Sequence, residues 1–139
     1  MKTKNRRPAG LRGYSLVEFL VVLLIVQVAV AIALPSLLST TRTARTKAAN
    51  ANARALATTV QANYMRLGGK DYTTVITSSG SDVTGNIAKD LGGTVPVNPC
   101  TGGSTLGIDY ILTSDSTSAS VQAKPGSNCD ATTTYSMGT

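Results

Sequence analysis

Histidine is absent from this chain of 139 residues, and the sequence also has no tryptophan and only two cysteines. Without histidine, nucleophilic catalysis by a Ser–His or Cys–His system is excluded. Two cysteines alone cannot complete a zinc site, and the glycine-rich stretch 101–107 lacks the lysine of a phosphate-binding loop. The sequence therefore predicts that the protein is not an enzyme and uses no cofactor or metal.

Acidic residues are also scarce, with seven Asp and Glu against thirteen Lys and Arg and a net charge of +6. The first thirteen residues hold five of the basic residues and no acid. The rest has eight basic and seven acidic residues, a net charge of +1 that is too weak to indicate a general polyanion-binding surface. The aspartates after residue 70 are scattered and lack calcium-loop spacing. The basic leader residues are Lys2, Lys4, Arg6, Arg7 and Arg12.

A long apolar run is present instead, because residues 19–34 are apolar at every position except Gln27. Glu18 stands at the start of this run, where a carboxylate in a membrane costs about 2.5–3.5 kcal/mol on insertion scales. A group that costly is a functional candidate that needs a partner. The basic leader predicts a cytoplasmic N-terminus and an exported remainder. Three basic residues after the run oppose this, but they are fewer and farther from it: Arg42, Arg45 and Lys47.

A single helical signal extends from Ser15 to about Leu67 and contains one proline, Pro35. Because proline removes a backbone donor and clashes with the carbonyl four residues earlier, we predict a kink or local opening at Pro35. The pattern after the proline is amphipathic, and Gly68-Gly69 indicates the end of the helix. The stripe predicted to pack on a sheet comprises Ala49, Ala53, Leu56, Val60, Tyr64 and Leu67.

From Lys70 onward the composition changes to Thr, Ser, Gly and Asp. Residues 70–93 are predicted to be a connecting region with one short helix around 82–91, and residues 96–100 are predicted to be irregular. Alternation over 106–112, 119–123 and 133–137 predicts three strands in a small antiparallel meander, with Leu106, Ile108, Tyr110 and Leu112 facing the helix. The predicted fold class is α+β: a long N-terminal helix, transmembrane and then amphipathic, packed on a small antiparallel β-sheet.

Cys100 and Cys129 lie in the part predicted to be exported, where a disulfide can form and persist. A bond between them would close a loop of about 29 residues and stabilise the fold by about 3–4 kcal/mol in the chain-entropy model. This contribution matters because no Phe or Trp follows the apolar run, and small cores often need such a crosslink. Two unrelated buried thiols are the alternative.

The basic leader, Gly13, the apolar helix with Glu18, and Pro35 together resemble the type IV pilin (prepilin) family over roughly the first 55 residues. In that family a prepilin peptidase cuts after a glycine and methylates the new N-terminal amine. The resemblance implies cleavage between Gly13 and Tyr14, N-methylation of Tyr14, and filament assembly through Glu18 of one subunit and the Tyr14 amine of another. Two positions depart from the usual family residues, because Tyr14 replaces Phe and Gln27 replaces Gly.

The resemblance implies four regions: a leader at 1–13, a transmembrane and filament-core helix at 14–35, an amphipathic helix at 36–69, and a β-sheet head with a disulfide loop at 70–139. The implied function is a structural subunit of a type IV pilus. Its implied partners are copies of itself in a helical filament, prepilin peptidase, an inner-membrane assembly platform and cytoplasmic ATPases. The precursor would lie in the inner membrane with a cytoplasmic N-terminus, and the mature chain in an extracellular pilus or periplasmic filament.

Several alternatives remain open at this stage. Within the family, the chain is alternatively a pseudopilin or minor pilin of a type II secretion or competence system. Outside it, a secretory signal peptide cleaved at Ala31-Ile32-Ala33, or a plain membrane anchor, explains the apolar run but not Glu18 and Gly13 together. DNA is a further candidate partner through phosphate contacts of the basic residues, although the sequence does not specifically indicate it.

Overall fold

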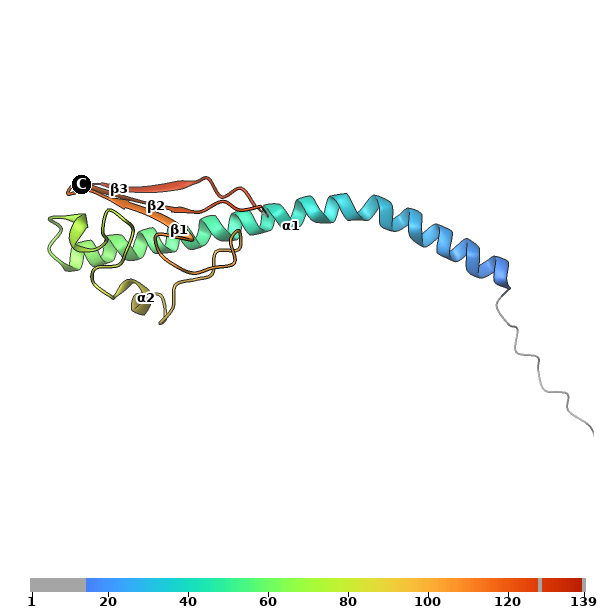
Figure 1. The fold of residues 1–139 in the computed structure, drawn as a ribbon, viewed down its shortest axis with the longest axis horizontal. Helices are drawn as coiled ribbons and strands as arrows, with labels where there is room; N and C mark the ends of the chain where they lie inside the picture. The colour runs from blue at the N-terminus through green and yellow to red at the C-terminus, as the bar shows by residue number, and fades with distance from the viewer. Residues whose placement is uncertain (1–14, 128, 139) are drawn as a thin grey trace, which may run out of the picture. The chain divides into compact units, whose positions relative to one another are not determined.

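The structure is a computed structural model that describes residues 15–127 and 129–138 (Figure 1). The chain divides into two compact units between Leu38 and Ser39. One helix, α1 (Leu16–Arg66), contributes residues to both units. The helix predicted from Ser15 to about Leu67 is therefore confirmed to within one residue at each end.

The second unit, residues 39–139 and called the head from here on, contains the second half of α1 and a three-stranded sheet. Strands β1 (Tyr110–Ser114), β2 (Ser118–Ala123) and β3 (Thr134–Gly138) are antiparallel neighbours in chain order. Figure 1 shows this sheet running alongside the second half of α1. The predicted α+β class and antiparallel meander are confirmed.

The core of the head lies between α1 and the sheet. From α1 it takes Ala49, Ala53, Leu56, Val60 and Tyr64, all buried, as the stripe predicted. The prediction for Leu67 was wrong, since its side chain is 52% exposed. Leu67 follows the last helical residue, and the chain turns away there through Gly68 and Gly69. These two glycines have positive φ angles of 93° and 64°, a conformation that glycine adopts at helix ends.

The sheet contributes its own buried side chains to the same core, namely Tyr110, Leu112, Ala119, Val121 and Ala123.

The first strand is shorter than predicted, because β1 begins at Tyr110. Ile108 is 60% exposed, and Leu106 makes only an isolated bridge to Tyr110. Gly107 has a φ of 80° and its amide donates to the Tyr110 carbonyl at 2.9 Å, so residues 105–109 form a turn. The prediction that Leu106 and Ile108 continue the strand was therefore wrong, because turn chemistry outweighed the alternation.

The connecting region contains a short 3₁₀ helix, η1 (Tyr72–Thr74), and one α-helical turn, α2 (Ile87–Asp90). The predicted helix around 82–91 is present only in its last part. Residues 82–86 instead form a turn around the Asp82 carboxylate, which accepts hydrogen bonds from the amides of Thr84, Gly85 and Ile87. Residues 96–100 are irregular, as predicted.

Candidate assembly surface

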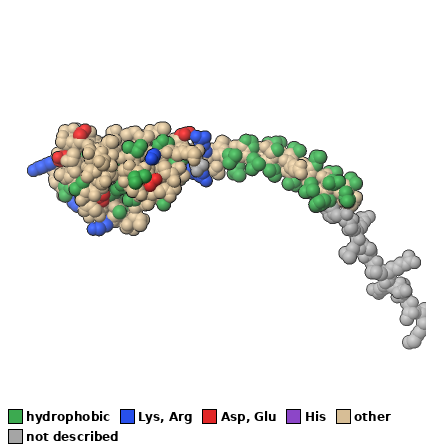
Figure 2. All heavy atoms as spheres, viewed as in Figure 1, with side chains coloured by type: hydrophobic (Ala, Val, Ile, Leu, Met, Phe, Trp, Pro, Cys, Tyr) green, Lys and Arg blue, Asp and Glu red, His purple; other side chains and the backbone are tan. Residues whose placement is uncertain are grey.

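The described part of the first unit is the start of α1, and its apolar side chains are exposed. Exposure of the large apolar side chains between Leu16 and Leu38 runs from 40% at Leu23 to 74% at Leu16. An uninterrupted apolar surface of this size needs lipid or protein to cover it. Figure 2 shows hydrophobic side chains along the whole of this segment.

Among the described residues, α1 is the one helix long and apolar enough to cross a membrane. A membrane anchor and a signal sequence both meet this test of length and composition. The core helix of a soluble protein meets it too, but such a helix is mostly buried, whereas none of this apolar segment is buried within the chain. The segment is therefore a candidate for contact with lipid or with other copies of the chain.

Glu18 lies in the first turn of α1 and is the only glutamate in the sequence. Its side chain is exposed, and the helix begins with a hydrogen bond from the Phe19 amide to the Ser15 carbonyl at 3.1 Å. The free backbone amides of a first helical turn favour a carboxylate there. The spacing Ser15-x-x-Glu18 also fits a capping box. Glu18 thus suits the start of its own helix, and its side chain is exposed there.

The remaining assembly residues predicted from the sequence are only partly placed. Gly13 and Tyr14 lie outside the described residues, so cleavage, N-methylation and the pairing of Tyr14 with Glu18 stay predictions. Pro35 lies inside α1, and the helix continues through it with no break in its assignment. The predicted kink at Pro35 also stays a prediction.

The predicted disulfide between Cys100 and Cys129 is confirmed, with the two Cα atoms 5.2 Å apart. Gly126 and Cys129 exchange backbone hydrogen bonds at 3.1 and 3.3 Å. Gly126 also packs against the backbone carbonyl of Cys100, so closely that a β-carbon would clash with it. The bond therefore sits in a compact loop in which position 126 has no room for a side chain.

Asn98 organises the segment that leads to this disulfide. Its side chain is fully buried, its Oδ1 accepts from the Cys100 amide at 2.9 Å, and its Nδ2 donates to the backbone carbonyls of Asp109 and Lys124. Its backbone carbonyl accepts from the Gly102 amide at 2.8 Å. Sequence reasoning missed Asn98, because a single buried asparagine inside an irregular segment has no distinguishing pattern.

The loop after the disulfide is attached to the head's part of α1 by polar contacts. Arg42 Nη2 forms an ion pair with Asp130 Oδ2 at 2.8 Å, and the Asp130 amide donates to Thr46 Oγ1 at 3.3 Å. Asn50 Nδ2 donates to Thr133 Oγ1 at 3.1 Å. Because both ionic side chains are more than half exposed, the ion pair positions the loop more than it stabilises the fold.

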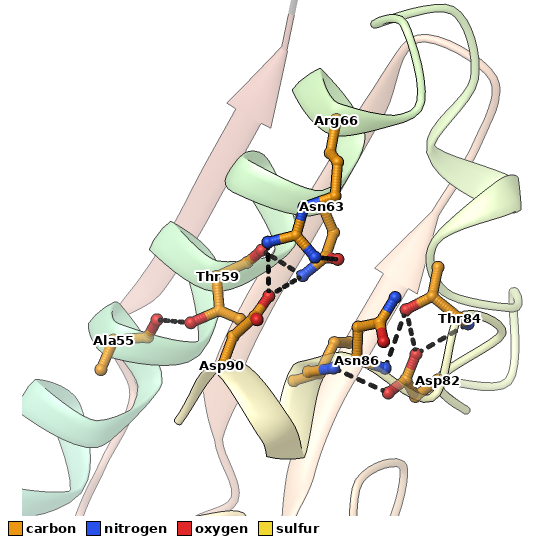
Figure 3. A network of polar contacts seen from close by, with 9 residues as sticks. Ala55, Thr59, Asn63, Arg66, Asp82, Thr84, Asn86 and Asp90 are labelled. Carbon is orange, nitrogen blue, oxygen red and sulfur yellow. Dashed lines mark hydrogen bonds and ion pairs between the residues drawn. The ribbon is translucent and has the colours of Figure 1, made fainter. Parts of the chain in front are cut away.

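A second polar network attaches α2 to the C-terminal end of α1 (Figure 3). Asp90 Oδ2 accepts from Asn63 Nδ2 at 2.9 Å and from Arg66 Nη2 at 3.2 Å. Asn63 is almost fully buried, and its amide also donates to the Thr59 carbonyl. Nearby, the rings of Tyr64 and Tyr72 stack with centroids 3.8 Å apart. These contacts fix the connecting region against the helix end.

Two aspartates of the head, Asp109 and Asp115, accept hydrogen bonds within turns. The Asp109 carboxylate accepts from the Thr105 amide at 2.9 Å, and this bond, with one from the Thr101 side chain, lowers the pKa of Asp109. Hydrogen bonds from the Ser118 hydroxyl, and from the amides of Thr117 and Ser118, lower the pKa of Asp115 to about 2. Within residues 15–127 and 129–138, no three His, Cys, Asp or Glu side chains gather as a group that could hold a metal ion.

Comparisons with known proteins found no matching family model, no matching curated protein and no matching solved structure.

Proposed function

We propose that this chain is a prepilin-like precursor whose mature form is the structural subunit of a type IV pilus-like filament. The observation that carries the proposal is the uncovered apolar segment of α1, which has Glu18 in its first turn and continues into a disulfide-closed head. A plain anchor needs the apolar surface, and in it a carboxylate at the start would serve only to cap the helix. A surface intended for other copies of the same helix uses both.

Assembly would proceed through the pairing of two groups that are costly in lipid. Glu18 of an incoming subunit would meet the Tyr14 amine of a subunit already in the filament, and each charge would offset the other. An unpaired charge in a low-dielectric helical bundle is strongly penalised, so the pair would select one axial register. Apolar packing along Leu16–Leu38 would supply the attraction between helices.

The head supports a pilus subunit over a pseudopilin for two reasons. Its Cys100–Cys129 loop is similar to the cysteine-bounded region of many pilins. Major pseudopilins of type II secretion usually lack such a loop and carry a calcium site instead, and the aspartates of this chain lack calcium-loop spacing. The proposed location is the inner membrane before assembly and an extracellular filament afterwards.

Replacement of Glu18 tests the proposal directly. We expect Glu18→Ala to leave a processed subunit in the membrane and to reduce sheared filament by about tenfold or more, because breaking a buried charge pair costs about 3–5 kcal/mol. Glu18→Asp, which keeps a carboxylate at the same position, is the matched control and should retain filaments. Filament yield at the wild-type level from Glu18→Ala would reject the proposed role.

The mass of the mature chain tests the processing step. In the native cells we expect a chain that begins at Tyr14, carries one additional methyl group and lacks two hydrogens because of the disulfide. Replacing Gly13 should leave the full-length precursor in the membrane. A mature chain that begins at Leu34 would instead mean an ordinary signal peptide and no filament.

A further inference from the structure

The first residues of the head carry a cluster of positive charge that filament assembly does not explain. Arg42, Arg45 and Lys47 follow the last apolar residue, Leu38, by four, seven and nine positions on the same helix. We call these three residues the basic collar. All three are exposed, and Figure 2 shows Lys and Arg side chains gathered on the stretch of α1 where the head begins. In the proposed topology the collar lies on the exported side, where basic residues are normally depleted.

The axial position of the collar fits the headgroup layer of a membrane. At about 1.5 Å per residue, the apolar stretch Leu16–Leu38 is about 34 Å long, close to the roughly 30 Å of a bilayer's hydrocarbon core. The collar then begins about 6 Å beyond Leu38 and occupies about 7.5 Å of the helix axis. A headgroup layer on each side of the core is about 5–7.5 Å thick. Measured along the helix, Arg42 would therefore start within the headgroup layer, and Arg45 and Lys47 would start about 10.5 and 13.5 Å beyond Leu38. Because helical side chains tilt toward the N-terminus and long basic side chains extend toward the membrane surface, Arg45 and Lys47 would reach back toward the lipid phosphates.

The collar also encircles the helix. With about 100° of rotation per residue, Arg42 and Arg45 point about 60° apart, Arg42 and Lys47 about 140°, and Arg45 and Lys47 about 160°. Lipid headgroups surround a spanning helix on every side that the head leaves uncovered, so they can meet charges that point in different directions. A DNA duplex approaches from one side and can meet only part of such an arrangement.

The charges of the collar are only partly neutralised by the protein. Arg42 is paired with Asp130, whereas Arg45 and Lys47 have no ion pair with any residue that the structure describes. Lys47 lines a shallow hollow of about 320 Å³ on this stretch of α1 together with Ser39, Thr40 and Thr43. The Lys47 ammonium is a suitable hydrogen-bond donor for phosphate oxygens.

We propose that the basic collar binds anionic phospholipid headgroups in the outer leaflet while the subunit awaits assembly. This proposal rests on the membrane-spanning stage of the proposed function and not on the filament itself. The bound lipids would hold the head at a fixed height and would have to be released when the subunit leaves the membrane. Anionic headgroups thus stabilise the membrane-resident subunit relative to the assembled one.

Energy transfer to labelled lipids tests this binding. The full-length chain, with a fluorescent amino acid in place of the exposed Thr132 near Asp130, is inserted into vesicles that carry a trace of acyl-labelled acceptor lipid in the outer leaflet. The acceptor is phosphatidylglycerol in one set and phosphatidylcholine in the other. We expect transfer to show enrichment of phosphatidylglycerol by up to about fivefold for each unpaired basic side chain at low salt. The enrichment should fall as salt is raised.

A double variant and its control identify the residues responsible. Arg45→Gln/Lys47→Gln should abolish the preference for phosphatidylglycerol. Lys70→Gln/Lys89→Gln removes the same charge from exposed positions beyond the end of α1 and should retain the preference. Equal transfer to both lipids in the wild-type chain, or equal loss in the two variants, would overturn the proposal.

Three further outcomes separate this proposal from its rivals. Protease protection in the same vesicles reports insertion: a chain that does not span would overturn both this proposal and the membrane stage of the proposed function. An inserted chain without lipid preference would overturn the proposed lipid binding by the collar and leave the membrane stage of the proposed function intact. If inorganic phosphate removes the preference and chloride at equal ionic strength does not, the collar is a free-anion site. A collar-dependent shift of duplex DNA without lipid preference would assign the collar to DNA. Either of the last two results would also overturn the proposal.

Discussion

The side-chain amide of Asn98 donates a hydrogen bond to the backbone carbonyl of Asp109 at 2.6 Å. The same amide group reaches the Lys124 carbonyl at 3.0 Å, and the side-chain oxygen accepts from Cys100. Asp109 immediately precedes β1 and Lys124 immediately follows β2. One fully buried side chain therefore connects the disulfide loop to the start of β1 and the end of β2, which lie together at the open end of the first hairpin.

Replacing Asn98 by Ala should destabilise the head by about 2–4 kcal/mol, because two carbonyls and one amide lose their partner in a buried site. Denaturant unfolding of the full chain in detergent, followed by tyrosine fluorescence, measures this. Asn86→Ala is the control, since the Asn86 side chain forms no cap hydrogen bond at the start of α2. Similar unfolding midpoints for the two variants would show that Asn98 does not anchor the loop.

Glycine positions 103 and 126 should differ in their tolerance of alanine. A β-carbon on Gly126 would meet the Cys100 backbone carbonyl, whereas one on Gly103 would meet the side-chain carboxylate of Asp109. Because a backbone atom in a crosslinked loop moves less easily than a carboxylate, Gly126→Ala should be the more destabilising, by about 1–3 kcal/mol. Gly138→Ala, where nothing lies near, should leave the thermal midpoint unchanged. The reverse order for positions 103 and 126 would contradict this account.

Acid should weaken the hairpin through Asp115. Hydrogen bonds lower its pKa to about 2 in the folded chain, against about 3.9 for an unfolded aspartate. A group with a depressed folded pKa stabilises the fold above the unfolded value, and that contribution is lost as the pH falls from about 4 toward 2. Asp115→Asn should flatten the stability profile in this window, measured by thermal unfolding at stepped pH. An unchanged profile, or a carboxyl carbon NMR titration near pH 4, would contradict the prediction.

Asp90 should contribute more to the stability of the head than its ion pair with Arg66 alone would. Arg66→Gln removes a partly exposed ion pair and a long hydrogen bond of 3.3 Å from Arg66 Nη1 to Asn63 Oδ1, and should cost about 1 kcal/mol. Asp90→Ala also removes a partner of the buried Asn63 amide and should cost about 1–2 kcal/mol more. Hydrogen exchange of the α2 amides should accelerate in Asp90→Ala and change little in Arg66→Gln. Equal losses of stability and equal hydrogen exchange in the two variants would contradict this prediction, because they would mean that Asp90 acts only through its contact with Arg66.

Strong periodic patterns in the sequence predicted the large elements well. The spacing of Ala49, Ala53, Leu56, Val60 and Tyr64 identified the buried face of α1, and Gly68-Gly69 identified its end. Alternation correctly indicated most of β1, β2 and β3. These predictions succeeded because each pattern repeats over several residues and faces one continuous core.

Local polar chemistry could not be predicted in the same way. Alternation at Leu106 and Ile108 was overridden by a turn around the Asp109 carboxylate, and the helix predicted from residue 82 was shortened by the turn at Asp82. Asn98 acts through partners up to 26 residues away, which no local pattern specifies. The apolar segment and Glu18 were evident from sequence as a candidate site, because a carboxylate at the start of an apolar run is unusual in itself.

The Cys100–Cys129 bond closes residues 100–129 of the head into a covalent ring and leaves one strand of the sheet outside it. Residues between the two cysteines, including β1 and β2, are bridged covalently, whereas β3 follows the ring. At about 3.4 Å per residue, the ring withholds about 100 Å of contour length from a chain that is pulled at its ends. Under tension an oxidised head can therefore lengthen only through the residues outside the ring, which include the second half of α1, the connecting region and β3, and never through the first hairpin.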